Sequence, residues 1–118
     1  MRKIFLACPY GHDDNDVVEK RFQIANAVSA QMIRSGAVVF SQVSMSHPIN
    51  ACMKDLDRAS IGATWAPVDA AFMEMMNELV ILDIEGWDKS AGIKREIAFF
   101  ESRDRKISLW SEIKNEFK

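Results

Sequence analysis

The sequence predicts an α/β domain built on an open parallel sheet with helices on both faces. Three observations lead to this prediction. Short apolar runs of strand length alternate along the chain with stretches of helical periodicity. The run at 79–82 is apolar at every position, as expected for a parallel strand that is buried on both faces. The 118 residues suffice for one hydrophobic core, so residues 1–118 are expected to form a single domain.

Four strands are expected, at 4–8, 37–40, 79–84 and 106–110, in a sheet of four to five strands. The segment 41–50 is rich in Ser, His, Pro and Asn and is expected to be a long polar loop. A short helix is expected within 49–56, on a weak signal.

The helices are expected between these strands. The first begins with Asn15 or Asp16 as its N-cap and ends at Gly36. A second begins near Pro67, because proline is tolerated at the first helical position, and runs to about residue 77. Ser90 can cap a third, which carries one apolar stripe, and a short terminal helix follows strand four.

Composition and charge limit the classes of partner. Fifteen basic and seventeen acidic residues give a formal charge of -2, so neither a nucleic-acid polymer nor a membrane surface is an expected partner. The apolar stretch after Met1 is short and is followed by acidic residues, which is unlike an export signal. Cys8 and Cys52 form no CxxC motif, so a reduced, cytoplasmic protein is expected, with a small molecule as its ligand.

Three loops that follow strands are expected to meet at one edge of the sheet: 9–16, 41–50 and 85–92. The polar residues that they or their flanks bring together are Tyr10, His12, Ser44, Ser46, His47, Asp83, Ser90 and Glu96. The sequence therefore predicts a ligand pocket at the carboxyl ends of the strands.

Glu96 is the main candidate for chemistry. It lies in the first turns of the helix that Ser90 caps, where the helix dipole favours an ionised carboxylate, and an ionised carboxylate beside a crevice is a candidate nucleophile. Asp83 at the end of the buried strand supplies a second acid, and glycosidic-bond chemistry uses two acids. The alternative is that Glu96 only stabilises the helix dipole.

The other candidates each have a structural alternative. Tyr10 can orient a carboxylate or be a half-buried aromatic residue, and Asp69 can be a proton donor or a helix-start acid. Ser90 with Gly92 can hold an anion at the helix start, although capping alone explains Ser90 equally well. Trp87 can stack on a base or merely cover the crevice.

Metal and cofactor chemistry is not expected. The two histidines and two cysteines lack ligand spacing, so no metal site is predicted, and nothing in the chain indicates a cofactor. Lys94 and Arg95 precede Glu96 but point in other directions along a helix, so both are expected to be solvated.

The start of the chain at 4–10, Asp69, Asp83 and the pattern Ser90-x-Gly92-x-x-x-Glu96 resemble the nucleoside 2-deoxyribosyltransferase superfamily. The stretch 40–50 is similar to that of a small bacterial branch. The resemblance covers nearly the whole chain. It implies a flavodoxin-like fold, and cleavage of the N-glycosidic bond of a nucleoside or nucleoside 5'-monophosphate through a covalent glycosyl-glutamate.

By this resemblance Glu96 is the nucleophile, Tyr10 positions it and Asp69 assists proton transfer to the base. Asp83 helps to hold the base or sugar, and Ser90 contacts a phosphate. The remaining residues expected at the substrate are Pro9, Gly92, Trp87 and His47. Relatives assemble as dimers or higher oligomers, so a homo-oligomer, dimer or tetramer, is implied.

This chain departs from many transferases, which have Asp-x-Gly-Thr where it has Ser90-Ala91-Gly92-Ile93. Hydrolysis is therefore as plausible as base transfer. Two other readings stay open: a non-catalytic nucleotide-binding or sensing module that uses the same crevice, and an interaction domain whose methionine-rich segment 72–76 builds an oligomer.

Overall fold

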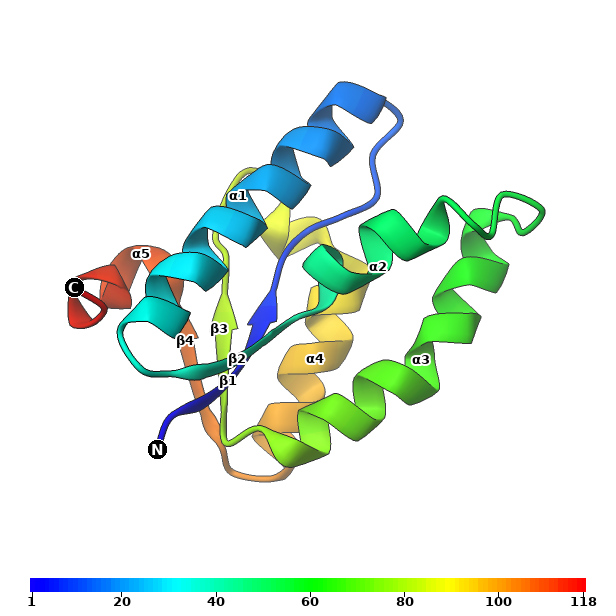
Figure 1. Ribbon diagram of the computed structural model, residues 1–118. Helices are drawn as coiled ribbons and strands as arrows, with labels where there is room; N and C mark the ends of the chain where they lie inside the picture. Colours follow the sequence, from blue (N-terminus) through cyan, green and yellow to red (C-terminus); the bar gives the residue numbers. More distant parts are fainter.

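The computed structural model describes residues 1–118 and confirms the predicted α/β class. Four parallel strands form an open, flavodoxin-like sheet in the order β2-β1-β3-β4 (Figure 1). The strands are β1 (Lys3–Ala7), β2 (Val38–Ser41), β3 (Glu78–Ile81) and β4 (Lys106–Leu109). In the centre of the sheet, Phe5 lies opposite Phe40 on one side and Leu79 on the other.

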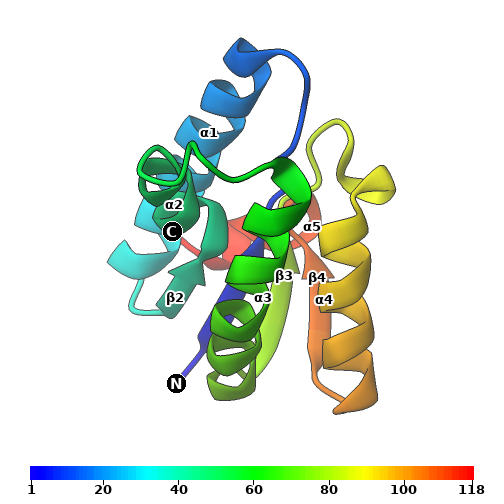
Figure 2. The ribbon, with the colours of Figure 1, turned by 90° about the vertical axis from the view of Figure 1, so that its right-hand side faces the viewer.

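Five α-helices connect or follow the strands: α1 (Asn15–Arg34), α2 (Gln42–Asn50), α3 (Arg58–Met75), α4 (Ala91–Ser102) and α5 (Trp110–Ile113). Two 3₁₀ turns complete the chain, η1 (Trp87–Lys89) and η2 (Lys114–Glu116). The helices lie in two layers, and Figure 2 shows α3 and α4 side by side in front of the sheet with α1 behind it.

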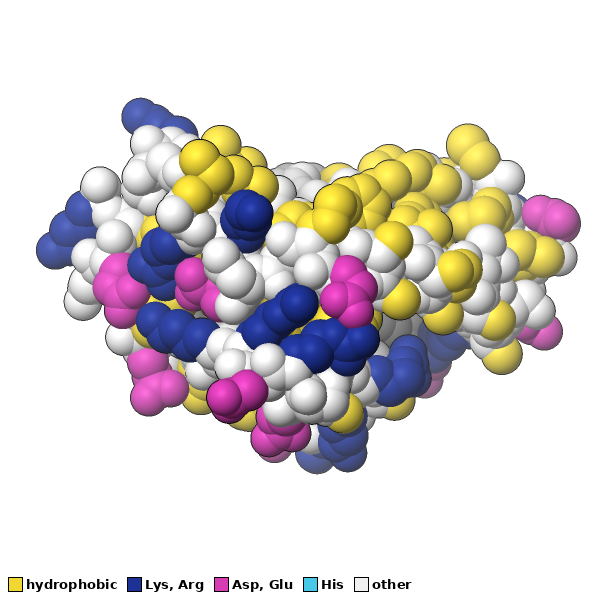
Figure 3. All heavy atoms as spheres, turned by 90° about the horizontal axis from the view of Figure 1, so that it is seen from below, with side chains coloured by type: hydrophobic (Ala, Val, Ile, Leu, Met, Phe, Trp, Pro, Cys, Tyr) yellow, Lys and Arg dark blue, Asp and Glu magenta, His cyan; other side chains and the backbone are white.

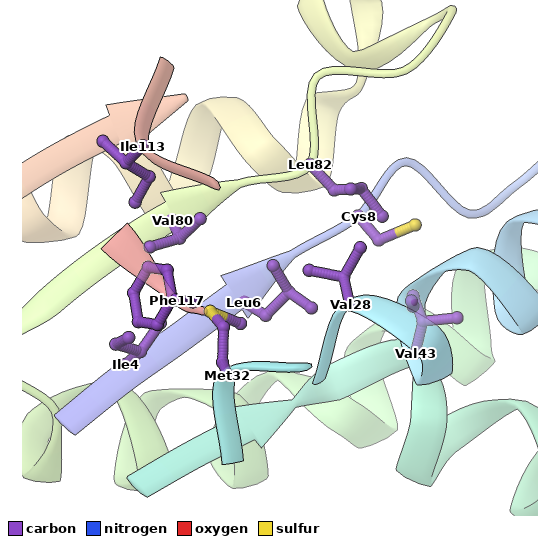
Figure 4. Packing of buried hydrophobic residues seen from close by; sticks show 11 residues of the cluster. Ile4, Leu6, Cys8, Val28, Met32, Val43, Val80, Leu82, Ile113 and Phe117 are labelled. Atoms are coloured by element: carbon purple, nitrogen blue, oxygen red, sulfur yellow. The ribbon is translucent and has the colours of Figure 1, made fainter. Parts of the chain in front are cut away.

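The alternation of side chains along β1 divides the core between the two faces. Ile4 and Leu6 point to the face that α1 and α5 cover, where they meet Met32 and Phe117 (Figure 4). Phe5 and Ala7 point to the opposite face, which α3 and α4 cover. Both sheet faces are therefore sealed by apolar contacts. This leaves the edge at the carboxyl ends of the strands to carry polar groups.

The predicted cap of α4 is confirmed, and that of α1 lies one residue from the prediction. Asp14, one residue before the expected cap, accepts a hydrogen bond from the Asp16 amide at 2.9 Å and begins α1. Ser90 caps α4 as predicted and accepts from the Ile93 amide at 3.2 Å. The helix α1 gives way to a turn in which Gly36 has a φ of +102°.

Two predictions between β2 and β3 were wrong. The expected polar loop at 41–50 contains helix α2, and the short helix expected within 49–56 is instead the turn region between α2 and α3. Helix α2 is held by burial of Val43 and Ser46, which are 1% and 2% exposed, although its polar composition is typical of loops. Tertiary contacts thus override weak local propensity.

The start of α3 was also predicted wrongly, because Pro67 lies inside this helix rather than at its beginning. The helix begins at Arg58, where Asp57 accepts a hydrogen bond from the Ser60 amide at 2.8 Å. The additional turns carry the helix past the end of the sheet and build one wall of the cavity described below.

The outer surface of α3 carries few charges. Between Arg58 and Glu74 its only charged residue is Asp69, and Ala70 and Met75 are among its exposed side chains. In Figure 3, which views the molecule from below, apolar side chains cover the region of α3. Most of the lysine, arginine and acidic side chains in this view lie away from that region. None of the helices combines the length and hydropathy needed to cross a membrane.

Candidate active site

A cavity of about 1130 Å³ opens at the carboxyl end of the sheet. Its walls come from the loop after β1, Arg21 of α1, one face of α2, the length of α3 from Arg58 to Met73, the loop before α4 and the first turns of α4. Figure 1 shows these segments gathered beyond the ends of β1 and β3. The predicted residues that line it are Pro9, Tyr10, Ser46, Asp69, Ser90, Gly92 and Glu96, whereas His12 and Ser44 do not.

Glu96 and Asp69 are the acidic residues of this cavity, and they reach it from α4 and α3. The pKa of Glu96 is raised to about 8. Burial is the largest cause, the nearby charge of Asp69 adds to it, and the charge of Arg95 has a smaller, lowering effect. Burial also raises the pKa of Asp69, to about 6, against the lowering effects of a Gln42 hydrogen bond and of Arg95.

These pKa values correct the expectation that the helix dipole keeps Glu96 ionised. Glu96 is the sixth residue of α4, beyond the first turn where the dipole acts, and desolvation dominates, so this carboxyl pair retains a proton near neutral pH. The Oδ1 atom of Asp69 is buried without a hydrogen-bond partner. An unsatisfied buried acceptor costs about 1–3 kcal/mol, so a ligand that donates a proton or a hydrogen bond to it gains affinity.

Gln42 is a functional candidate that the sequence analysis missed. It lies at the first position of α2, lines the cavity, and accepts a hydrogen bond through Oε1 from Ser46 Oγ at 3.3 Å. Its amide hydrogen-bonds Asp69. The prediction of a loop at 41–50 concealed this arrangement, because it is the helix that places residues 42 and 46 one turn apart on the same face.

We expect Gln42→Leu to raise the pKa of Asp69, because the substitution removes the hydrogen bond that favours the ionised carboxylate. The measurement is a carbon NMR titration of the side-chain carboxyl groups in aspartate-labelled protein. Ser44→Ala is the control, since the Ser44 hydroxyl bonds Ser41 Oγ and Ser44 does not line the cavity. An unchanged Asp69 titration in Gln42→Leu would show that Gln42 plays no part in holding this carboxylate.

Tyr10 lines the cavity, but its hydroxyl does not bind Glu96 as the resemblance implied. The hydroxyl instead makes a hydrogen bond of 2.7 Å with Nδ1 of His47. His47 lies outside the cavity, in a smaller pocket on the other side of the Tyr10 ring. Tyr10 therefore lies in the predicted pocket without the predicted contact to Glu96, whereas His47 lies outside the cavity and contacts Tyr10.

The structure places Asp83 away from the cavity. Its carboxylate accepts hydrogen bonds from the Ser111 amide at 3.0 Å and from the Ser111 hydroxyl, and so holds the start of α5. Partial burial opposes ionisation of Asp83, but these bonds and the charge of Lys114 outweigh it and lower its pKa. The predicted contact of Asp83 with a substrate is replaced by this structural role.

Trp87 is likewise not a cavity residue. It lies in η1 and packs against the apolar cluster under α3 and α4, so it neither stacks on a ligand in the cavity nor covers it, which were the two expected roles. Ser90 combines its capping bond with a position on the cavity wall, and Gly92 lies beside it. A Cβ added at Gly92 would meet only ordinary contacts, so this glycine is not required by close approach.

Basic side chains surround the opening of the cavity: Arg21, Arg58, Lys89 and Arg95. Arg95 is exposed and forms no ion pair with Glu96, as expected, but it also lines the cavity and its charge acts on both Asp69 and Glu96. Arg21 donates to the carbonyl oxygens of Gly11 at 3.3 Å and Glu85 at 3.1 Å, which ties together the loops after β1 and β3.

Gly86 makes room for this arginine. It has a φ of +93°, and a Cβ added there would lie 2.7 Å from Nη2 of Arg21. We expect Gly86→Ala to reduce the free energy of unfolding more than Gly36→Ala, because Gly36 also has a positive φ but would meet nothing within 4 Å. The backbone strain alone costs about 1 kcal/mol, and displacement of Arg21 adds to it.

Urea denaturation of both variants, with and without Arg21→Gln, measures this difference. The excess loss in Gly86→Ala should disappear in the Arg21→Gln background. Equal losses at the two glycines in the wild-type background would show that Arg21 moves aside at no cost.

Cys8 forms part of the cavity floor and is neutral. Burial raises the pKa of its thiol to about 12, and the thiol donates to the Pro9 carbonyl oxygen at 3.3 Å. Cys52 is exposed, and both cysteines are free. The structure contains no group of three His, Cys, Asp or Glu side chains arranged to hold a metal ion.

The fold and the cavity together define an α/β protein of flavodoxin-like architecture with two acidic residues in a cleft at the carboxyl edge of its sheet. Comparison with protein families then identifies its group. The model of the domain of unknown function DUF1937 matches residues 2–112, so the chain belongs to this family. No curated protein matches the sequence.

Proposed function

We propose that this protein cleaves the N-glycosidic bond of a nucleoside or nucleoside 5'-monophosphate, with Glu96 as the nucleophile and Asp69 as the acid. One observation supports this most: Glu96 and Asp69 line the same cavity and hold their last proton to near neutral pH. Retaining glycosidases need two such carboxyl groups, one ionised and one protonated.

The pair offers this combination between about pH 6 and about pH 8, when it carries one proton. Before a substrate binds, this proton resides mainly on Glu96, whose pKa is the higher of the two. Productive binding moves it to Asp69, whose unpartnered Oδ1 then faces the leaving base. The positive charge that develops on the sugar in the transition state favours the same arrangement, because it stabilises an ionised Glu96.

The proposed reaction is a double displacement at C1' of the sugar. A carboxylate oxygen of Glu96 forms a bond to C1' of the sugar, the C1'–N bond breaks, and its electron pair leaves with the base nitrogen, which takes the proton from Asp69. Water or a second base then attacks C1', giving up a proton to Asp69, and Glu96 leaves as a carboxylate. Two inversions leave the configuration at C1' unchanged.

The substrate class is supported by the size and charge of the cavity. A volume of about 1130 Å³ accommodates a ligand of nucleotide size. Basic side chains at the opening, such as Arg58 and Lys89, favour a ligand with an anionic group, and the start of α4 at Ser90 presents backbone amides. The resemblance to nucleoside 2-deoxyribosyltransferases points to the same class.

The experiment is incubation of the purified protein with a panel of nucleosides and nucleoside 5'-monophosphates, with and without a second free base. Release of free base supports hydrolysis, and appearance of a new nucleoside supports transfer. Glu96→Gln protein is the control for contaminating activity. Binding of a panel member without any base release would instead favour a nucleotide-sensing module.

The proposed partner is therefore a small molecule in a reduced, cytoplasmic environment, with no nucleic-acid polymer or membrane involved. A homo-oligomer is also proposed, on the resemblance and on the nearly uncharged outer face of α3, since such faces are commonly buried in assemblies. Light scattering of the purified protein measures its mass in solution. A monomer at all concentrations would contradict the homo-oligomer.

A further inference from the structure

A second pocket of about 450 Å³ adjoins the cavity, and Tyr10 and Asn50 line both of them. The side chains that line only the second pocket include Glu19, Phe22, His47 and Lys54. Tyr10 and Asn50 thus form a partition between the cavity that contains the acidic pair and a pocket with no assigned role.

His47 holds this partition in place. Its Nδ1 atom, at 2.7 Å, is the hydrogen-bond partner of the Tyr10 hydroxyl, and the two rings meet edge to face with centroids 5.6 Å apart. Phe22 contacts the His47 ring from α1, with centroids 4.6 Å apart. The imidazole is therefore fixed by aromatic contacts, while its nitrogens remain available for directed bonds.

Glu19 completes the arrangement on the outer side. Its Oε1 lies 3.5 Å from Nε2 of His47. A neutral imidazole that accepts the Tyr10 hydroxyl proton at Nδ1 carries its own hydrogen on Nε2, which is the nitrogen that faces Glu19. Glu19 thus favours the tautomer that leaves Nδ1 free to accept from Tyr10.

We propose that His47 is a positioning residue for the cavity, acting through Tyr10: its hydrogen bond fixes the Tyr10 ring as the partition between the two pockets, and Glu19 sets the tautomer. The role of the cavity as the place of reaction rests on the proposed function. His47 does not line the cavity, so it acts on a ligand only through the ring that it holds.

Tyr10 is the only tyrosine of the chain, so tyrosine-labelled protein reports this ring alone in NMR spectra. In His47→Leu we expect the Tyr10 ring signals to shift and the hydroxyl proton to exchange rapidly with water. His47→Asn keeps an acceptor near the Nδ1 position and should resemble the wild type. His12→Gln, which changes the only other histidine, should leave the Tyr10 signals in place.

Indole signals of the three tryptophans verify that each variant is folded. If His47→Leu fails to fold, His47→Gln takes its place, because the longer side chain carries its amide past the Nδ1 position. Two results would overturn the proposal. One is that the Tyr10 signals of His47→Leu, or of His47→Gln if that variant is used, coincide with those of the wild type. The other is that His47→Asn shifts these signals by the same amount as that variant does.

A kinetic measurement separates positioning from general structural support. On the panel member that is cleaved best, kcat/KM should fall about tenfold in His47→Leu and much less in His47→Asn, a difference within the range of one hydrogen bond. In a Tyr10→Phe background, the His47→Leu substitution should have no further effect. An equal tenfold loss on both backgrounds would overturn a role that runs through Tyr10.

The two proposals fail in different ways. If no panel member releases a base, the proposed function fails, and the NMR comparison still decides whether His47 fixes Tyr10. If bases are released but the Tyr10 signals ignore His47, the proposed function stands and the positioning role is wrong.

Discussion

Replacement of Glu96 by glutamine is expected to abolish base release while making the protein more stable at neutral and alkaline pH. Turnover is lost because the amide cannot form the glycosyl ester, and the loss should exceed about a thousandfold. Stability rises because the variant no longer has to ionise a carboxyl group in a desolvated position, where the pKa of Glu96 is raised to about 8.

The sign of the stability change follows from proton binding. The unfolded chain releases this proton near the ordinary pKa of 4.5, whereas the folded protein keeps it to about pH 8. Between these values the folded state binds more protons, so the free energy of unfolding of the wild type falls as pH rises. Glu96→Gln removes this fall.

Urea denaturation at pH 5 and pH 8 measures the effect. The variant and the wild type should be about equally stable at pH 5, and at pH 8 the variant should be more stable by on the order of 4 kcal/mol, at about 1.4 kcal/mol for each unit by which the pKa is raised. Glu101→Gln, an exposed substitution on the same helix, is the matched control and should change neither stability nor turnover. A Glu96→Gln protein that is less stable than the wild type at both pH values would contradict the burial of this carboxyl group.

Asp69→Asn is expected to slow cleavage in a manner that depends on the leaving group. For a substrate whose base must be protonated as it leaves, kcat should fall by about 10²–10⁴, the usual contribution of a general acid. For a nucleoside whose base is a pyridinium cation, the base leaves neutral without a proton, so the same variant should retain nearly the wild-type rate.

The pH profile should change as well. The wild-type rate is expected to peak between about pH 6 and about pH 8, to fall below this range when both carboxyl groups are protonated, and to fall above it when neither is. Asp69→Asn should lose the alkaline fall, because no acid remains to be titrated. Its acid limb should move to higher pH, because the rate then follows the ionisation of Glu96 alone, and burial keeps the pKa of Glu96 above that of Asp69.

Asp83→Asn provides the matched control, because Asp83 binds Ser111 and does not line the cavity. This variant should leave the dependence on the leaving group unchanged. Equal slowing of both substrates by Asp69→Asn would show that Asp69 is not the acid.

The sheet could be predicted because its strands depend on local apolar runs, such as 79–82, which fit no other role in a domain of this size. Helix α4 could be predicted because Ser90 and the apolar stripe starting at Ile93 give consistent local signals. Helix α2 could not, since burial of Val43 and Ser46 decides its structure, and burial depends on residues distant in sequence.

The site was predictable in position but not in detail. The carboxyl edge of the sheet and Glu96 follow from topology and spacing. Three details depend on contacts between separate elements. Glu96 is protonated, Gln42 hydrogen-bonds Asp69, and Asp83 binds Ser111 in place of a substrate. Such contacts leave no local pattern in the sequence. The sequence alone therefore predicted that Asp83 contacts a substrate, whereas in the structure it binds Ser111.

A covalent glycosyl group on Glu96 can be detected by mass spectrometry of the protein, quenched rapidly after reaction with a 2-fluorinated analogue of the best substrate, which slows release of the glycosyl group. We expect one added sugar, located by fragmentation to Glu96 within the peptide 96–103, and none in Glu96→Gln. Base release accompanied by an adduct on another residue, or by no adduct under any quenching condition, would contradict it.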